Sequence, residues 1–468
     1  MQDFGTLLHT YLKEKHNYSI SAFAKRISIS AGLLNHIFNG KRTMTPEKFL
    51  LTINSGIFDL EEREALKTAY FIGRYGEKDY EKISLLSDTL KKFRFGEAPE
   101  ISGCTDINAV GYGELTERRE IFSALNELFL STGNTVYTNI PHANNIINHV
   151  LYKLTKDYPD SRMVRFIPNY SVKFTQRNLI TLLSILRFAK ARVNTVSLDN
   201  VEVEHLDKTT LFPYFVISDS IMIILDAQCK KGVAFTGKIV KDKYRITELS
   251  AESSASVVNF FSDEISAVNH IINYEDNLIH SLRTSPCFLA LEDLSFLVTA
   301  ANDFPNKQEL VSYLMNRRSD KQRINFCTQA GLEKFLESGK SYELSETYIK
   351  RFSPKAKQEF IESLISTVES SRTYHNYFLS RTTEVSKFFS DVDITVYEKS
   401  ALVTSVYDTP NEKSFSGEIS IHIPGGELLR IIDKYVSDYL PISGDVLPKQ
   451  TTLLYLKGLL IDCRIQNE

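Results

Sequence analysis

The sequence predicts a multidomain protein in which a small all-α domain precedes a larger α/β body that divides into two related lobes. Three observations support this fold class. The chain has 468 residues, about three times a typical domain length. Apolar side chains recur at helical spacing in the first fifty residues, whereas strand-like and helical segments alternate beyond residue 130. A series of three short strands followed by a helix occurs twice.

Composition excludes several classes of protein. With 43% hydrophobic and 24% charged residues, the chain is neither collagenous nor largely disordered. Its five cysteines are far apart and never form C-x-x-C, so we expect no disulfide framework, no metal and no cofactor. The N-terminus lacks the order of a signal peptide, and no apolar run is long enough to cross a bilayer. We therefore expect a cytoplasmic protein with no membrane partner.

The net charge of −3 conceals an asymmetry along the chain. Residues 1–50 carry seven basic and three acidic side chains, a local charge of +4, and the other 418 residues sum to −7. A basic end on an acidic body indicates that one small module meets an anion while the rest of the chain has another task.

The first fifty residues predict a series of short helices. The first runs to about residue 17, and the second follows a cap at Ser19 or Ser21. Ser30 caps a third helix from residue 31 to residue 39, and Gly40 follows it as a residue able to take positive φ. A fourth helix begins at Thr45-Pro46.

The second and third of these helices have the pattern of a helix-turn-helix. About three residues join them, Ala24 is small where they cross, and Leu34 and Ile37 hold the second against the first. Residues 19–49, SISAFAKRISISAGLLNHIFNGKRTMTPEKF, resemble the lambda-repressor/Cro-like (XRE-type) helix-turn-helix DNA-binding domain, and the resemblance covers roughly residues 4–72. Ser28 stands at the turn position where this family most often carries glycine.

The resemblance implies a set of DNA contacts. The third helix would enter the major groove, where Ala31, Gly32 and Asn35 would meet base edges and His36 a base or a phosphate. The implied phosphate contacts are Ser19, Ser30, Asn39, Lys41 and Arg42. The partner would be a double-stranded DNA operator read by a homodimer, and because residues 1–50 offer no dimer surface, the rest of the chain would supply one.

The chain is expected to divide at three places. Residues 1–75 form the helix-turn-helix DNA-binding domain, and residues 76–112 form a helical linker that could also be a dimerisation helix. Residues 113–285 form the first α/β lobe and residues 286–468 the second. The strands expected in these lobes are residues 135–140, 163–167, 193–198, 212–217, 221–225, 233–239, 392–398, 401–407 and 418–423, with helices over residues 144–156, 175–191, 253–272 and 426–439.

This arrangement loosely resembles the two-lobed phospholipase-D-like fold. The resemblance implies catalysis by histidine and lysine in an H-x-K motif, once per lobe. None of the ten histidines has lysine two residues later, and no G-x-S-x-G, P-loop or H-E-x-x-H motif occurs. The resemblance is therefore to a catalytically dead form, and we expect no enzyme and no catalytic residues.

Two loops at the ends of predicted strands are candidate effector sites, because open α/β sheets bind ligands at the carboxyl ends of their strands. They contain Asn139, His142 and Asn169. Together these features predict a transcriptional regulator of the repressor class with a C-terminal region for dimerisation and for sensing a small-molecule or peptide effector. Two alternatives stay open: an enzyme or toxin-like effector with an autoregulatory helix-turn-helix, and a peptide-sensing regulator with an all-helical repeat body.

Overall fold

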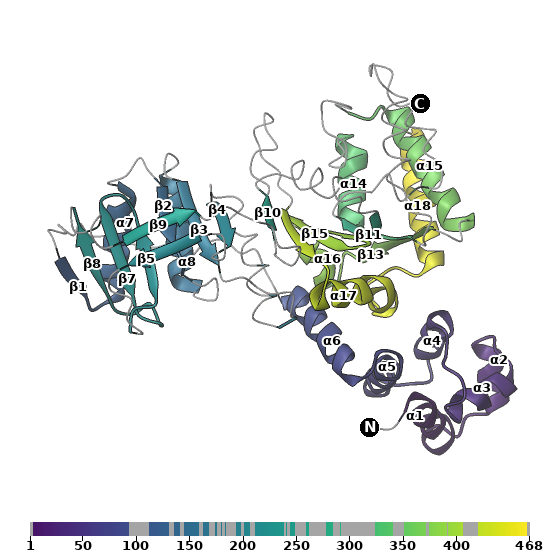
Figure 1. Cartoon of the computed structure of the whole chain (residues 1–468). Helices are drawn as coiled ribbons and strands as arrows, with labels where there is room; N and C mark the ends of the chain where they lie inside the picture. The colour runs from purple at the N-terminus through teal and green to yellow at the C-terminus, as the bar shows by residue number, and fades with distance from the viewer. Residues whose placement is uncertain are drawn as a thin grey trace. The chain divides into compact units, whose positions relative to one another are not determined.

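The computed structural model in Figure 1 describes residues 3–92, 112–130, 135–140, 145–158, 162–167, 174–175, 179, 183, 193–197, 201–205, 211–237, 240, 244–248, 259–261, 278–283, 291, 323–339, 351–370, 374–390, 392–405 and 420–465. The chain forms two compact units. One contains Met1–Asp88 together with Lys434–Val446, and the other contains Thr89–Asp433 and Leu447–Glu468.

The N-terminal unit is helical. Its elements are α1 (Phe4–Thr10), a π-helical continuation η1 (Tyr11–Lys15), α2 (Ile20–Arg26), α3 (Ala31–Phe38), α4 (Pro46–Ile53), α5 (Leu60–Tyr75), α6 (Glu77–Lys92), η5 (Tyr435–Tyr439) and the 3₁₀ turn η6 (Leu440–Ile442). The residues before α1, α2, α3, α4 and α5 all cap their helix, because each side chain accepts a hydrogen bond from a first-turn N–H. These caps fix where the short helices begin.

Aromatic and aliphatic side chains fill the centre of this unit. Phe23, Leu34, Phe49 and Phe58 are almost completely buried in one cluster. At the crossing of α1 and α3 the backbones touch, because a Cβ added at Gly5 would overlap the carbonyl oxygen of Ile37. Close packing of this kind holds the short helices together, since helices of seven or eight residues are marginal in isolation.

The second unit contains two seven-stranded mixed sheets and a two-stranded ribbon. The first sheet consists of β1 (Tyr112–Leu115), β2 (Thr135–Thr138), β3 (Arg162–Ile167), β4 (Val193–Ser197), β6 (Tyr214–Ile217), β7 (Ile221–Leu225) and β8 (Gly232–Thr236). Helices α7 (Arg118–Leu130) and α8 (Asn145–Asp157) share a hydrophobic core with this sheet. The ribbon pairs β5 (Val201–His205) with β9 (Tyr244–Glu248).

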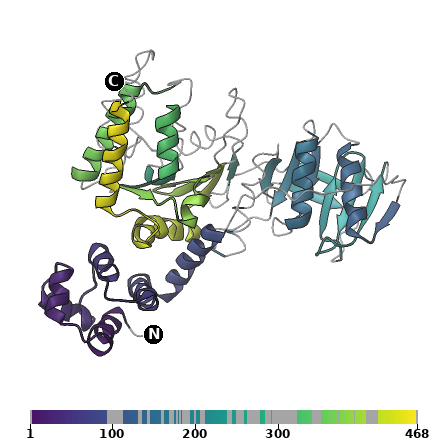
Figure 2. The same ribbon diagram turned by 180° about the vertical axis from the view of Figure 1, so that it is seen from behind.

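The second sheet consists of β10 (Asn259–Phe261), β11 (Leu278–Arg283), β12 (Arg323–Thr328), β13 (Tyr374–Leu379), β14 (Val392–Tyr397), β15 (Ser400–Ser405) and β16 (Ser420–Pro424). Figure 2 shows α14 (Gln329–Ser338), α15 (Pro354–Ser370) and α18 (Lys449–Ile465) on one face of this sheet. Helices α16 (Glu384–Phe388) and α17 (Glu427–Lys434) lie on the other face.

The two sheets have the same topology. Numbered by chain order, the strands of each sheet follow one another as first, seventh, sixth, fifth, second, third and fourth. In both sheets the second, third and fourth strands pair in parallel and all other pairs are antiparallel. The repeat of three strands seen in the sequence is therefore part of a repeat of a whole sheet.

Two expectations need correction. The helix expected over residues 253–272 contains β10, a short edge strand that pairs with β16, so tertiary pairing overrides the local pattern there. The lobe boundary expected at residues 285/286 lies too late, because β10 and β11 already belong to the second sheet. The sheets also exclude an all-helical repeat body.

Candidate nucleic-acid interface

The turn between α2 and α3 is a Schellman motif. The N–H of Ser28 donates to the carbonyl of Lys25 at 3.2 Å, and the N–H of Ile29 donates to the carbonyl of Ala24 at 2.9 Å. Ser28 itself has a φ of 56°, the left-handed conformation for which glycine is usual. The turn expected from the sequence is therefore present, although a serine occupies its left-handed position.

Helix α3 is fixed at both ends by its own residues. Ser30 accepts a hydrogen bond from the N–H of Leu33 at 3.1 Å and so caps the start of the helix. At its end, Gly40 has a φ of 67°, and the N–H of Lys41 donates to the carbonyl of His36 at 2.9 Å in a second Schellman motif. The side-chain amide of Asn39 donates to the carbonyl of Asn35 at 2.9 Å, so part of its hydrogen-bonding capacity stabilises the helix end.

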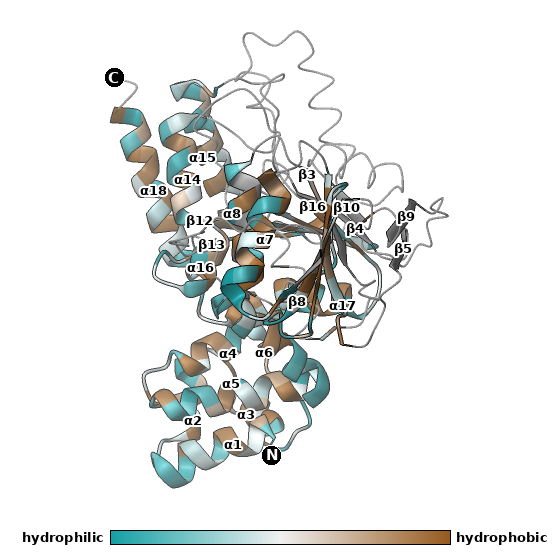
Figure 3. Ribbon diagram, turned by 90° about the vertical axis from the view of Figure 1, so that its left-hand side faces the viewer, coloured by the Kyte–Doolittle hydropathy of each residue, from teal (hydrophilic) through white to brown (hydrophobic). Residues whose placement is uncertain are grey.

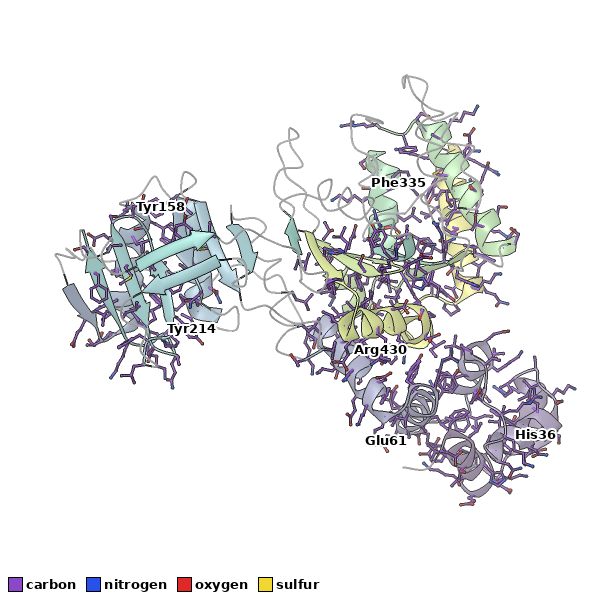
Figure 4. The ribbon with its side chains drawn as sticks, in the orientation of Figure 1. His36, Glu61, Tyr158, Tyr214, Phe335 and Arg430 are labelled. Carbon is purple, nitrogen blue, oxygen red and sulfur yellow. The ribbon has the colours of Figure 1, made fainter. Side chains whose placement is uncertain are left out.

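One side of α3 is packed and the other faces solvent. Leu34, Ile37 and Phe38 are buried in the core of the unit. The residues expected to contact DNA are all exposed, namely Ser19, Ser30, Ala31, Gly32, Asn35, His36, Asn39, Lys41 and Arg42. Figure 4 labels His36 on the outer side of the helix. The structure thus gathers eight of these residues on α3 and its two ends, while Ser19 caps α2.

The segment around α2 and α3 is free of negative side chains. Between Glu14 and Glu47 the sequence contains no aspartate or glutamate. The same stretch carries exposed Lys25 and Arg26 on α2 in addition to Lys41 and Arg42. Exposed cations with no nearby carboxylate in the chain favour binding of an anionic surface.

A buried carboxylate secures the end of the first helix. Glu62 is 1% exposed, and it contacts the ammonium of Lys15 at 2.7 Å and the ring of His16 at 2.8 Å. It also accepts a hydrogen bond from the N–H of Asp59 at 2.9 Å, as part of a capping box at the start of α5. Burial alone would raise the pKa of Glu62, but these three partners outweigh burial and the pKa is lowered.

The C-terminal segment Lys434–Val446 belongs to this unit. The sequence patterns did not predict that this segment packs with the N-terminal helices. Ile442 is 2% exposed in the same core cluster as α3, and Tyr439 packs on Phe71 with ring centroids 4.6 Å apart. Two ion pairs flank this packing, Arg74 with Asp438 at 3.0 Å and Lys434 with Asp79 at 2.6 Å. The aromatic residues on both sides of the contact were the only hint of it in the sequence. Because the partners lie some 360 residues apart, no local sequence pattern shows that they pair.

The candidate effector residues have different outcomes. The side chain of Asn139 accepts from the N–H of Phe215 at 2.7 Å and donates to the carbonyl of Pro213 at 3.0 Å, so it joins β2 to β6. This is a structural task within the first sheet. His142 and Asn169 lie outside the described residues.

The second sheet buries a polar layer that sequence motifs missed. Ser281 donates to Asn325 on the neighbouring strand at 2.9 Å, and Arg283 donates to Thr395 at 3.4 Å. Arg283 and Arg323 are only 6% and 1% exposed. The register places Asp393 and His422 on the same face. The counterparts of β14 and β15 in the first sheet, β6 and β7, carry no charged residue, whereas β3, the counterpart of β12, contains Arg162 and Arg165.

Neither a metal centre nor a membrane-spanning helix is found among the described residues. Within them, no three histidine, cysteine, aspartate or glutamate side chains come close enough together to hold a metal ion. The helices in the described part of the chain include none with the length and hydropathy of a membrane span.

No protein-family model matches the sequence, and a comparison with curated proteins gives no match. Among solved structures, the chain is similar to TrmBL2, an archaeal chromatin protein with a novel mode of DNA binding, at 13% identity, covering 40% of this chain and 64% of that one, with a TM-score of 0.20. It is similar to phosphatidylserine synthase of Haemophilus influenzae at 10% identity, covering 82% and 98%, with a TM-score of 0.21. It is also similar to yeast tyrosyl-DNA phosphodiesterase at 9% identity, covering 63% and 85%, with a TM-score of 0.19.

Scores this low do not show a shared fold. The match also spans less than two thirds of the chromatin protein.

Proposed function

We propose that the chain is a sequence-specific, DNA-binding transcriptional regulator that acts as a dimer. In this proposal α2 and α3 form a helix-turn-helix of the lambda-repressor/Cro-like type and α3 enters the major groove of a double-stranded operator. The two-lobed body provides dimerisation and senses an effector. It has no catalytic role in the proposal.

One observation carries the proposal: a capped, solvent-facing α3 follows a tight Schellman turn, and residues 19–46 contain four exposed cations and no carboxylate. Lys41 and Arg42 follow directly after the helix and are suited to phosphates. On α3 itself, Asn35 is exposed and can pair in bidentate fashion with the N6 and N7 atoms of adenine. Small residues at 31 and 32 permit close approach of the helix to the base edges.

The decisive test measures binding to DNA fragments captured from the genome by the purified protein. Fluorescence anisotropy should show affinity that falls steeply with salt, because each phosphate contact releases counterions. The Lys41→Ala/Arg42→Ala variant should lose affinity on every sequence and reduce the slope of log K against log salt by about two. Unchanged affinity, or a flat salt dependence in the parent protein, would sink the proposal.

Two further variants distinguish base-specific recognition of the operator from electrostatic attraction to DNA phosphates. Asn35→Ala should cost about 1–3 kcal/mol on the operator and little on unrelated DNA. The control removes an exposed lysine at the start of α6, as Lys78→Ala. Figure 1 shows the start of α6 well away from α2 and α3, so this control should leave the salt slope almost unchanged.

The polar layer of the second sheet favours a second candidate function, in which the body binds a polar ligand or carries out chemistry. Buried arginines on adjacent strands, together with a carboxylate and an imidazole, are the type of cluster found at ligand sites. Within the regulator proposed above, this layer is a better candidate for effector sensing than Asn139. A ligand bound there should raise the melting temperature of the parent protein and not that of Arg323→Gln.

A further inference from the structure

Helix α18 carries large apolar side chains on the side opposite to the one that is packed. Thr452, Leu456 and Cys463 are buried against α15 and the second sheet. On the opposite side, Leu454, Ile461 and Ile465 are 73%, 58% and 65% exposed. Hydrophobic residues recur along the helix in Figure 3. Large apolar side chains that gather on one exposed face of a helix indicate a surface that binds a partner.

The exposed residues form a continuous stripe. Leu454, Gly458, Ile461 and Ile465 follow one another at spacings of four, three and four residues, which is the d-a-d-a pattern of a coiled coil. A Cβ added at Gly458 would meet nothing within 4 Å, so the stripe is open at its centre. The other large exposed hydrophobic residues of the described chain are scattered over α4, α5, α7, α8 and the turn before β6, without such a stripe.

Charged residues flank the stripe in a way that suits a second copy of the same helix. In the heptad set by the stripe, Lys457 takes a g position and Asp462 the e position five residues later. In a parallel pair of helices, g of one copy faces the following e of the other, so each copy offers an ammonium opposite a carboxylate. Both residues are exposed. The ammonium of Lys457 forms an ion pair with Glu369 at 2.9 Å, and the Lys457 side chain is nevertheless 54% exposed.

We infer that the outer face of α18 is the homodimer interface, on which the α18 of a second copy packs in parallel. The inference rests on the proposed function in one respect, because reading a palindromic operator requires two copies. Two heptads make a small interface, so the dimer should be weak, with a dissociation constant on the order of micromolar. Two copies bound to adjacent half-sites would add to this affinity.

The test is sedimentation equilibrium of the full chain without DNA. The parent protein should shift from monomer to dimer with rising concentration, whereas Leu454→Glu/Ile461→Glu should stay monomeric. The matched control is Leu130→Glu/Leu211→Glu, which changes two residues that are 62% and 70% exposed elsewhere, and it should dimerise like the parent. A parent protein that is monomeric at all concentrations, or a stripe variant that still dimerises, overturns the inference.

A second pair of variants tests orientation without adding charge to the stripe. Ile461→Cys should form a disulfide between copies under mild oxidation, because a d residue meets itself in a parallel pair. Asp462→Lys should weaken the dimer at least several-fold, and Asp462→Lys/Lys457→Glu should restore it. Absence of the cross-link together with unchanged dimerisation of Asp462→Lys overturns the parallel arrangement. DNA binding is measured separately, so a dimer that binds no DNA contradicts the proposed function alone.

Discussion

At the residue scale, the turn before α3 holds a serine in a conformation that favours glycine. Ser28 has a φ of 56°, and left-handed backbone costs an ordinary residue about 1–2 kcal/mol. Ser28→Gly should therefore raise the free energy of unfolding by up to about 1 kcal/mol, since glycine's larger loss of entropy offsets part of the gain. Ser28→Val should lower it by about 1–2 kcal/mol, because branching at Cβ makes positive φ worse.

Urea unfolding of the three proteins measures both effects. Ser21→Gly serves as the control, because Ser21 lies within α2 and there glycine should destabilise. If Ser28→Gly and Ser21→Gly destabilise equally, the left-handed turn does not carry the strain that we assign to it.

The buried carboxylate makes a second prediction at this scale, on the pH dependence of stability. Because the pKa of Glu62 is lowered in the folded state, its stabilising contribution is present above the ordinary glutamate value of 4.5 and is lost as the pH falls through the folded value. Glu62→Gln should be less stable at neutral pH by about 1–3 kcal/mol. The difference from the parent should shrink on acidification, because protonated Glu62 and glutamine are both uncharged.

Denaturation midpoints of the N-terminal unit between neutral and acidic pH give this measurement. Lys15, His16 and Asp59 face the carboxylate and stay unchanged in the variant. A difference between variant and parent that is the same at every pH would show that Glu62 acts through packing and not through its charge.

At the element scale, local patterns predict where helices and strands lie but not how they pair. The strands at 163–167, 221–225 and 392–398 coincide with β3, β7 and β14, because their hydrophobic runs are bounded by turn residues. In each sheet, an antiparallel pair between strands far apart in the chain joins the parallel strands to the antiparallel ones. These pairs are β2 with β6 and β11 with β14. No periodicity encodes these pairs, since they depend on which apolar faces meet in three dimensions.

The candidate site shows the same contrast between features that follow from local sequence and features that depend on tertiary packing. The caps at Ser19 and Ser30 and the positive φ of Gly40 follow from residue chemistry and are confirmed. The hydrogen-bonding of Asn39 to Asn35 and the contribution of Ile442 to the core do not follow from it, because both require the folded chain. Contact with DNA stays a prediction for all nine residues.

At the scale of the whole molecule, the N-terminal unit is built from two stretches that are far apart in the chain. The polypeptide leaves it within α6, re-enters it at Lys434, the last residue of α17, and leaves again at Val446 before α18. The returning segment contributes Ile442 and Tyr439 to the core that also contains residues of α3 and α5. We therefore predict that the stability of α3 and α5 depends on this segment.

This dependence predicts how the protein responds to loss of one buried side chain far from the proposed DNA contacts. Ile442→Ala should lower the stability of the N-terminal unit by about 2–4 kcal/mol, because a buried isoleucine is lost and a cavity replaces it. Amide hydrogen exchange should speed up in α5 and α6 and extend to α3, while the second sheet keeps its protection. Ile146→Ala, which truncates an isoleucine of α8 that is 44% exposed, is the control and should leave exchange in these helices unchanged. Equal exchange in Ile442→Ala and the parent would mean that residues 1–92 hold their fold without the C-terminal segment. That result would contradict the prediction.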